Sequence, residues 1–130
     1  MAGFKQAFEN SVINVYFRGG TYTGGTVYVG LYTTAPTDTT EGTEVSGGGY
    51  ARQAVTFAAP SGNPAQTSNT ADIVFPEATA NWGTIVAVAI HSAATGTGNQ
   101  IAWANVQTPK AINAGDTAVI KAGNLTITVD

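Results

Sequence analysis

Hydrophobic residues near the N-terminus recur at the spacing of an α-helix. Phe4, Phe8, Val12 and Val15 fall on one side of a helical wheel, three or four residues apart. This spacing predicts an amphipathic helix over residues 4–17, with its apolar side turned toward other protein atoms.

Residues at both ends of this segment also favour a helix. Lys5 and Glu9 are four residues apart and predict an ion pair on the outer side, in the weaker of the two orders. Arg18 lies where the helix dipole favours a cation, and Gly19–Gly20 would end the helix. The β-branched and aromatic run 12–17 also suits a strand, which is the alternative.

Beyond residue 26, apolar and polar residues alternate with the period of β-strands, and glycine and proline separate the alternating runs. Tyr28 and Tyr32 share one face of the first run, and Val29 and Leu31 share the other. The pattern predicts seven strands: Val27–Tyr32, Ala51–Ala58, Thr70–Phe75, Thr84–His91, Gln100–Val106, Thr117–Lys121 and Leu125–Val129.

The strand pattern also predicts how the sheet is arranged. Thr84–His91 is apolar on both faces, which indicates a central strand covered on each side. Residues 122–124 predict a hairpin loop between the last two strands. We expect a mainly β fold, an antiparallel β-sandwich (jelly-roll-like) with one N-terminal α-helix. It would form a single domain over residues 1–130, with the helix in 1–19 and the sandwich in 27–130.

The composition of the chain argues against nucleic-acid and membrane binding. Of the 130 residues, 10% are charged, against about 25% in typical soluble domains, and the net charge is −3. The five basic residues are scattered, so we expect no nucleic-acid partner. No apolar run approaches the ~18 residues of a membrane span, and no secretory signal is recognisable. The sequence therefore predicts a protein made in the cytoplasm, with no membrane partner.

The residues that carry chemistry are few. His91 is the only histidine and there is no cysteine, so we interpret His91 as a structural residue at a strand end and expect no transition-metal site. Asp38, Glu41 and Glu44 lie in the polar loop 33–46, where a calcium site is the alternative to a solvated, mobile acidic loop. We expect no catalytic residues, no metal, no cofactor and no enzyme activity.

The glycine triplet at residues 47–49 predicts a sharp turn. A strand follows it, which excludes a phosphate-binding loop because that motif leads into a helix. In this strand Tyr50 and Arg52 share one face, and Val55 and Phe57 share the other.

Aromatic side chains are the remaining candidates for binding. We expect most of them in the core or in a subunit interface, with a carbohydrate platform as the alternative. Trp82 is expected to anchor the central strand by burying its indole. The aromatic residues weighed in this way are Tyr16, Tyr22, Tyr28, Tyr32, Tyr50, Trp82 and Trp103.

Several short motifs follow one another in a fixed order along nearly the whole chain. They are Arg18-Gly19, Val27–Tyr32, Thr34-Ala35-Pro36, Gly47–Arg52, Phe75-Pro76, Trp82-Gly83-Thr84, Thr108-Pro109-Lys110, Asn113–Asp116 and Ala122–Thr128. In this order they resemble a small phage virion protein family, whose members are often labelled tail-fibre proteins and some of which look like capsid decoration (cement) proteins. The chain departs from commoner forms at His91-Ser92, where an acidic residue would follow the central strand.

This resemblance implies a non-enzymatic structural protein of a virion. The favoured interpretation is a homotrimer that binds the major capsid protein on the capsid exterior. The alternative is a tail-fibre or tail-tip component, with a host-surface glycan as its partner. Candidate residues for the subunit or capsid interface are Phe4, Phe8, Tyr22, Tyr50 and Arg52.

Overall fold

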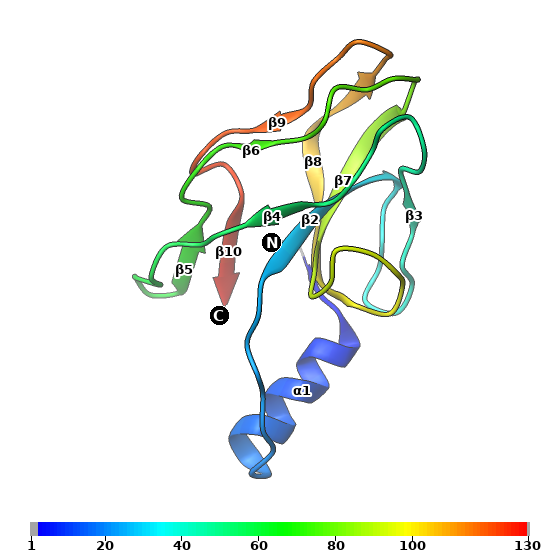
Figure 1. The fold of residues 1–130 in the computed structure, drawn as a ribbon. Helices are drawn as coiled ribbons and strands as arrows, with labels where there is room; N and C mark the ends of the chain where they lie inside the picture. Colours follow the sequence, from blue (N-terminus) through cyan, green and yellow to red (C-terminus); the bar gives the residue numbers. More distant parts are fainter. Residues whose placement is uncertain (1–2, 130) are drawn as a thin grey trace.

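The computed structural model describes residues 3–129, which form an antiparallel β-sandwich with one helix near the N-terminus (Figure 1). This confirms the fold class predicted from the sequence. The parts of the sequence predictions that concern residues 1, 2 and 130 lie outside the described residues.

The larger sheet holds six strands, all paired antiparallel. The strand β7 is central, between β8 and β2, as its two apolar faces predict. Across the sheet the strands are β1 (Gly3–Phe4), β8 (Gln100–Ile112), β7 (Gly83–His91), β2 (Val27–Thr34) and β3 (Thr43–Glu44), and β4 (Gln53–Val55) pairs with β2 beside β3.

Two small ribbons form the second layer, on one side of the large sheet in Figure 1. The first pairs β5 (Ala65–Ser68) with β10 (Thr126–Val129), and the second pairs β6 (Ile73–Val74) with β9 (Val119–Ile120). The expected hairpin between the last two strands is therefore wrong. Gly123 does turn the chain, with φ +83°, but each strand beside the turn pairs with an earlier part of the chain.

The main core lies between the large sheet and these ribbons. Alternation directs Val29 and Leu31 of β2 into it, and β7 contributes Ile85, Val88 and Ile90. Residues 85 and 88 reach the same core although they are an odd number of positions apart, because the register of β7 with β8 shifts between Ile85 and Ala87. The opposite face of the sheet buries a second, smaller cluster, which contains Tyr32, Ala87 and Ala89.

Strand bounds differ from the prediction where polar residues form strands. The strand β5, with the sequence Ala-Gln-Thr-Ser, was not predicted because it has no apolar alternation. The expected strand over residues 51–58 is shortened to β4 and one isolated bridge at Phe57. Of the run 70–75, only Ile73 and Val74 form a strand.

The helix α1 spans Gln6–Phe17, two residues shorter at its start than predicted. Phe4 lies in β1, paired with Ala102. Lys5 precedes the helix and is buried, and its ammonium donates to the carbonyls of Thr37 and Thr40, so the expected pair with Glu9 does not form. Burial lowers the pKa of the Lys5 ammonium.

The other end of α1 agrees with the prediction. Gly19 has φ +72°, and the amide of Gly20 donates to the carbonyl of Asn14 at 2.8 Å, so the glycine pair ends the helix. Within residues 3–129 no helix has both the length and the apolar character needed to cross a bilayer.

Candidate functional site: an apolar groove beside α1

The helix α1 extends away from the sandwich, at the bottom of Figure 1. None of its residues is buried, although one face is apolar as predicted. An isolated helix of 12 residues is marginal in water, because helical stability in proteins comes mainly from tertiary packing. The contacts within this chain therefore leave most of the packing surface of α1 unused.

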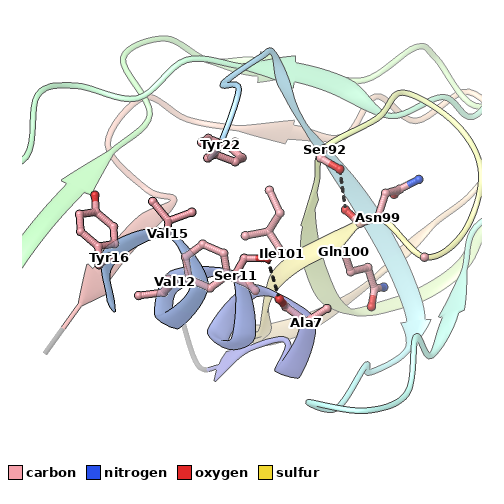
Figure 2. Close-up of a pocket in the computed structure, with 12 residues that line it drawn as sticks. Ala7, Ser11, Val12, Val15, Tyr16, Tyr22, Ser92, Asn99, Gln100 and Ile101 are labelled. Carbon is pink, nitrogen blue, oxygen red and sulfur yellow. Dashed lines mark hydrogen bonds between the residues drawn. The ribbon is translucent and has the colours of Figure 1, made fainter. Parts of the chain in front are cut away.

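An open groove of about 410 Å³ lies between α1 and the start of β8 (Figure 2). In Figure 2, Val12 and Val15 of α1 and Ile101 of β8 surround the space, with Tyr22 on its far side. No lining residue carries a formal charge. The lining consists of Ala7, Phe8, Ser11, Val12, Val15, Tyr16, Tyr22, Ser92, Gly98, Asn99, Gln100 and Ile101.

The structure brings together three of the five residues predicted for an interface. Phe8 and Tyr22 line the groove, and Phe4 stacks on Phe8 with ring centroids 5.0 Å apart. Tyr50 and Arg52 lie elsewhere, in a polar cluster with Glu44 on the side of the large sheet where Tyr32 is buried. Their role in an interface stays a prediction.

The polar cluster is built around the ion pair of Arg52 and Glu44. Arg52 donates through Nε and Nη2 to the two carboxylate oxygens of Glu44, each at 2.8 Å, and its side chain is 5% exposed. Burial would raise the pKa of the Glu44 carboxyl, but hydrogen bonds from Arg52 and from the Tyr50 hydroxyl outweigh burial and hold it below its usual value. Burial also raises the pKa of the Tyr50 phenol.

His91 belongs to the same cluster and is fully buried. Its Nδ1 lies 2.6 Å from Oδ1 of Asn99, an atom that only accepts, so Nδ1 carries the proton and Nε2 accepts from the Tyr32 hydroxyl at 2.7 Å. Burial lowers the pKa of His91 and raises the pKa of Tyr32 to about 12. Both nitrogens of His91 are thus satisfied, which confirms the interpretation of a structural histidine at a strand end.

Gly30 makes room for this cluster in the middle of β2. A side-chain carbon at this position would lie 2.7 Å from Oε2 of Glu44 and 3.0 Å from the Tyr50 hydroxyl. Sequence reasoning did not identify this role, because a glycine inside a strand pattern can equally mark a bulge, a bend or a close approach by another group.

Hydrogen bonds connect the three acids of the loop 33–46 to other parts of the chain, whereas residues 37–40 are exposed, as expected for a solvated loop. Glu44 is paired, and the Glu41 carboxylate accepts from the amide of Gly98 at 2.9 Å. Asp38 accepts from the Trp103 indole at 3.3 Å. The three acids thus have separate partners, and residues 3–129 contain no group of three or more potential metal ligands.

The cluster also supports the groove. Asn99, which accepts from His91 and from Arg52 Nη1, is at the same time a lining residue. Sequence reasoning found the helical side of the groove from the apolar stripe. It missed Ser92 and residues 98–101, because only the fold brings this loop beside the helix.

Fold and groove together define a small β-sandwich protein with an open, uncharged groove beside α1. Residues 3–128 match the family model described as "Podophage GP4 fiber I protein gp80", and the chain belongs to this family of phage fibre proteins. The resemblance to a phage virion family seen in the sequence is thereby confirmed. A comparison with curated proteins finds no match.

Proposed function

We propose that this chain is a homotrimeric subunit of a phage fibre and acts by association, without catalysis. The observation that carries the proposal is α1, a helix with no buried residue beside an open groove without charged residues. A surface of this kind is stabilised when another protein covers it. The family description supports a place in a fibre of the virion.

The distribution of charge supports the same role. The more buried of the two ion pairs found in residues 3–129, Arg52 with Glu44, is satisfied by groups of the same chain. The groove has no ionised group to desolvate, so covering it costs little. Association would therefore be driven by apolar burial, and we expect it to be insensitive to salt.

Capsid decoration is the second candidate. The observation that favours it is the small, compact sandwich of 130 residues, without the repeats or long heptads of an extended fibre. Three copies bound side by side on the major capsid protein would act together through effective concentration, even if each contact were weak.

An add-back experiment tests both placements. Purified chain is added to phage particles made without it and, separately, to tailless capsids, and binding is measured by co-sedimentation and electron microscopy. A fibre subunit binds the tailed particles made without the chain, but not the tailless capsids. A decoration protein binds both and raises the temperature at which capsids open. Binding to neither contradicts both proposals.

Host-surface glycan binding is a further proposal for a fibre, with the exposed ring of Tyr22 as a candidate contact. Because Tyr22 lines the groove, a glycan bound there would compete with any protein that covers the groove. Titration of a host-glycan panel with the parent chain and with Tyr22→Ala tests it. Saturable binding that the variant loses supports the proposal, and no binding by the parent chain contradicts it.

A further inference from the structure

We propose that the groove is filled by α1 of a neighbouring copy, which inserts the apolar residues on the outer side of its helix. This inference rests on the proposed homotrimer and names the surface that forms it. We call Ile13 and Phe17 the outer patch; they are 53% and 79% exposed. The groove of one copy and the outer patch of the next would form each contact.

The outer patch and the groove lie on opposite sides of one helix. Successive residues of an α-helix turn by about 100°, so Ile13 and Phe17 are directed roughly half a turn away from Phe8 and Val15. A surface helix normally has one apolar side, whereas a helix that is apolar all round is buried. The second half of α1 has apolar residues on both sides, which indicates that protein covers both in the assembly.

Two different surfaces on one chain determine the kind of symmetry. When a patch binds a different patch on the next copy, the contact is head-to-tail, and closed assemblies of this kind are rings. A ring of three agrees with the proposed trimer. The three α1 helices would then lie together. Each helix would cover the groove of one neighbour, and the groove of its own chain would be covered by the helix of the other neighbour.

The accessible surface is larger than that of a typical folded monomer. The chain has 7428 Å² of accessible surface. A folded monomer of 13.2 kDa is expected to have about 6,400 Å² by the usual scaling with mass. Each chain of a ring takes part in two contacts, so the excess of about 1,000 Å² provides about 500 Å² for each contact, which corresponds to a small interface by comparison with the ~800 Å² of a standard one.

The chemistry of the two surfaces also fits. The groove lining has no charged residue, and neither Ile13 nor Phe17 is charged. Glu9 lies one turn before Ile13 on the same side of α1, so a contact centred on Phe17 would leave the Glu9 carboxylate at its rim, in water. The aromatic ring of Phe17 and the branched side chain of Ile13 are the apolar anchors that occupy such grooves in helix recognition.

Disulfide trapping tests the pairing directly, since the chain has no cysteine of its own. Chains with Phe17→Cys and chains with Tyr22→Cys are mixed in equal amounts and oxidised. A head-to-tail contact joins the two kinds of chain almost exclusively, whereas random collision makes mixed pairs only half of the product. As a control, Val74→Cys, 53% exposed and on β6 at the end of the sandwich away from α1 (Figure 1), should give only the random proportion with Tyr22→Cys. A random proportion for the Phe17→Cys mixture would overturn the inference.

A second variant tests the strength of the contact. Ile13→Asn with Phe17→Asn should raise the dissociation constant of the trimer at least about thirty-fold, the loss expected for anchors at an interface centre. Val74→Asn on β6 should leave it unchanged. Circular dichroism should show both proteins folded, because these side chains are exposed within one chain. A trimer that persists in the double variant overturns the inference.

The two proposals fail in different ways. A chain that is monomeric at every concentration but still binds phage particles overturns this contact and leaves the role on the virion intact. A trimer that depends on Phe17 but binds no particle supports this contact and contradicts the proposed function.

Discussion

The sandwich interior and the helix α1 use the same kinds of side chain in opposite ways. Phe75 lies in the main core at 1% exposure, whereas Phe17 on α1 is 79% exposed. Phe75 is covered by side chains of the same chain, among them Tyr50, whose ring stacks 6.3 Å from it. The comparison shows that an apolar residue within a regular element need not be covered by its own chain.

The polar cluster and the groove also differ in whether their contacts are made within the chain. The cluster contains residue types that are common in catalytic sites, namely a histidine, an arginine, a glutamate and two tyrosines. Their polar groups form hydrogen bonds and an ion pair within the chain. The groove has no such residues and is left open. In this protein the open groove is therefore the candidate functional site, and the polar cluster is not.

The largest difference in the free energy of unfolding is expected when a phenylalanine ring is removed from the sandwich core and, separately, from α1. Phe75→Ala should lower the free energy of unfolding by about 3–5 kcal/mol, because it leaves a cavity in the core. Phe17→Ala should change it by less than about 0.5 kcal/mol when urea unfolding is followed at concentrations where the chain is monomeric. Comparable losses in both variants would show that α1 is packed within its own chain.

The ion pair of the polar cluster should have the next largest effect. Arg52→Met should lower the free energy of unfolding by about 3 kcal/mol, because it leaves the Glu44 carboxylate half-buried without its partner. Adding Glu44→Gln should recover part of the loss, which a double-mutant cycle measures. The exposed pair of Lys121 and Asp72 provides the control, and Lys121→Met should have little effect. Equal effects of Arg52→Met and Lys121→Met would contradict the structural role of the cluster.

Two neighbouring glycines of the turn 47–49 give a finer comparison. Both Gly47 and Gly48 have positive φ, so alanine at either should cost about 1 kcal/mol in backbone strain. A side-chain carbon at Gly48 would also lie 2.9 Å from the Trp82 indole nitrogen, whereas at Gly47 it would meet nothing. Thermal unfolding should therefore show Gly48→Ala less stable than Gly47→Ala by at least about 1 kcal/mol. Equal losses would indicate that Trp82 is not packed on this turn.

The smallest effect is a pH dependence from His91. Burial lowers the pKa of His91 in the folded chain below the unfolded value of about 6.5. As the pH falls below 6.5 the unfolded chain therefore binds the proton first, and stability decreases with a slope of up to about 1.4 kcal/mol per pH unit. Urea midpoints between pH 5 and 8 should show this slope in the parent chain and lose it in His91→Gln. An unchanged slope in the variant would assign the effect to other groups, such as Glu44, whose contribution falls at lower pH.

Local patterns predicted the elements that depend on neighbours in sequence. The stripe from Phe8 to Val15 identified the helix and the side of it that lines the groove, and the two-sided apolar run of Thr84–His91 identified the central strand. The polar strand β5 could not be found, because its pairing with β10 stabilises residues that have no strand pattern of their own. The expected last hairpin failed for the same reason, since β9 and β10 each pair with a distant partner.

By itself the sequence determined the fold class, the apolar side of α1, the turn at residues 47–49 and the lack of thiol chemistry, because each follows from the side chains and backbone preferences of nearby residues. Only the tertiary structure decided that Arg52 and Glu44 pair inside the chain, that Gly30 leaves space for them, and that the loop before β8 faces α1. These features depend on contacts between segments far apart along the chain. A local sequence pattern does not indicate which distant segments lie next to each other in the fold.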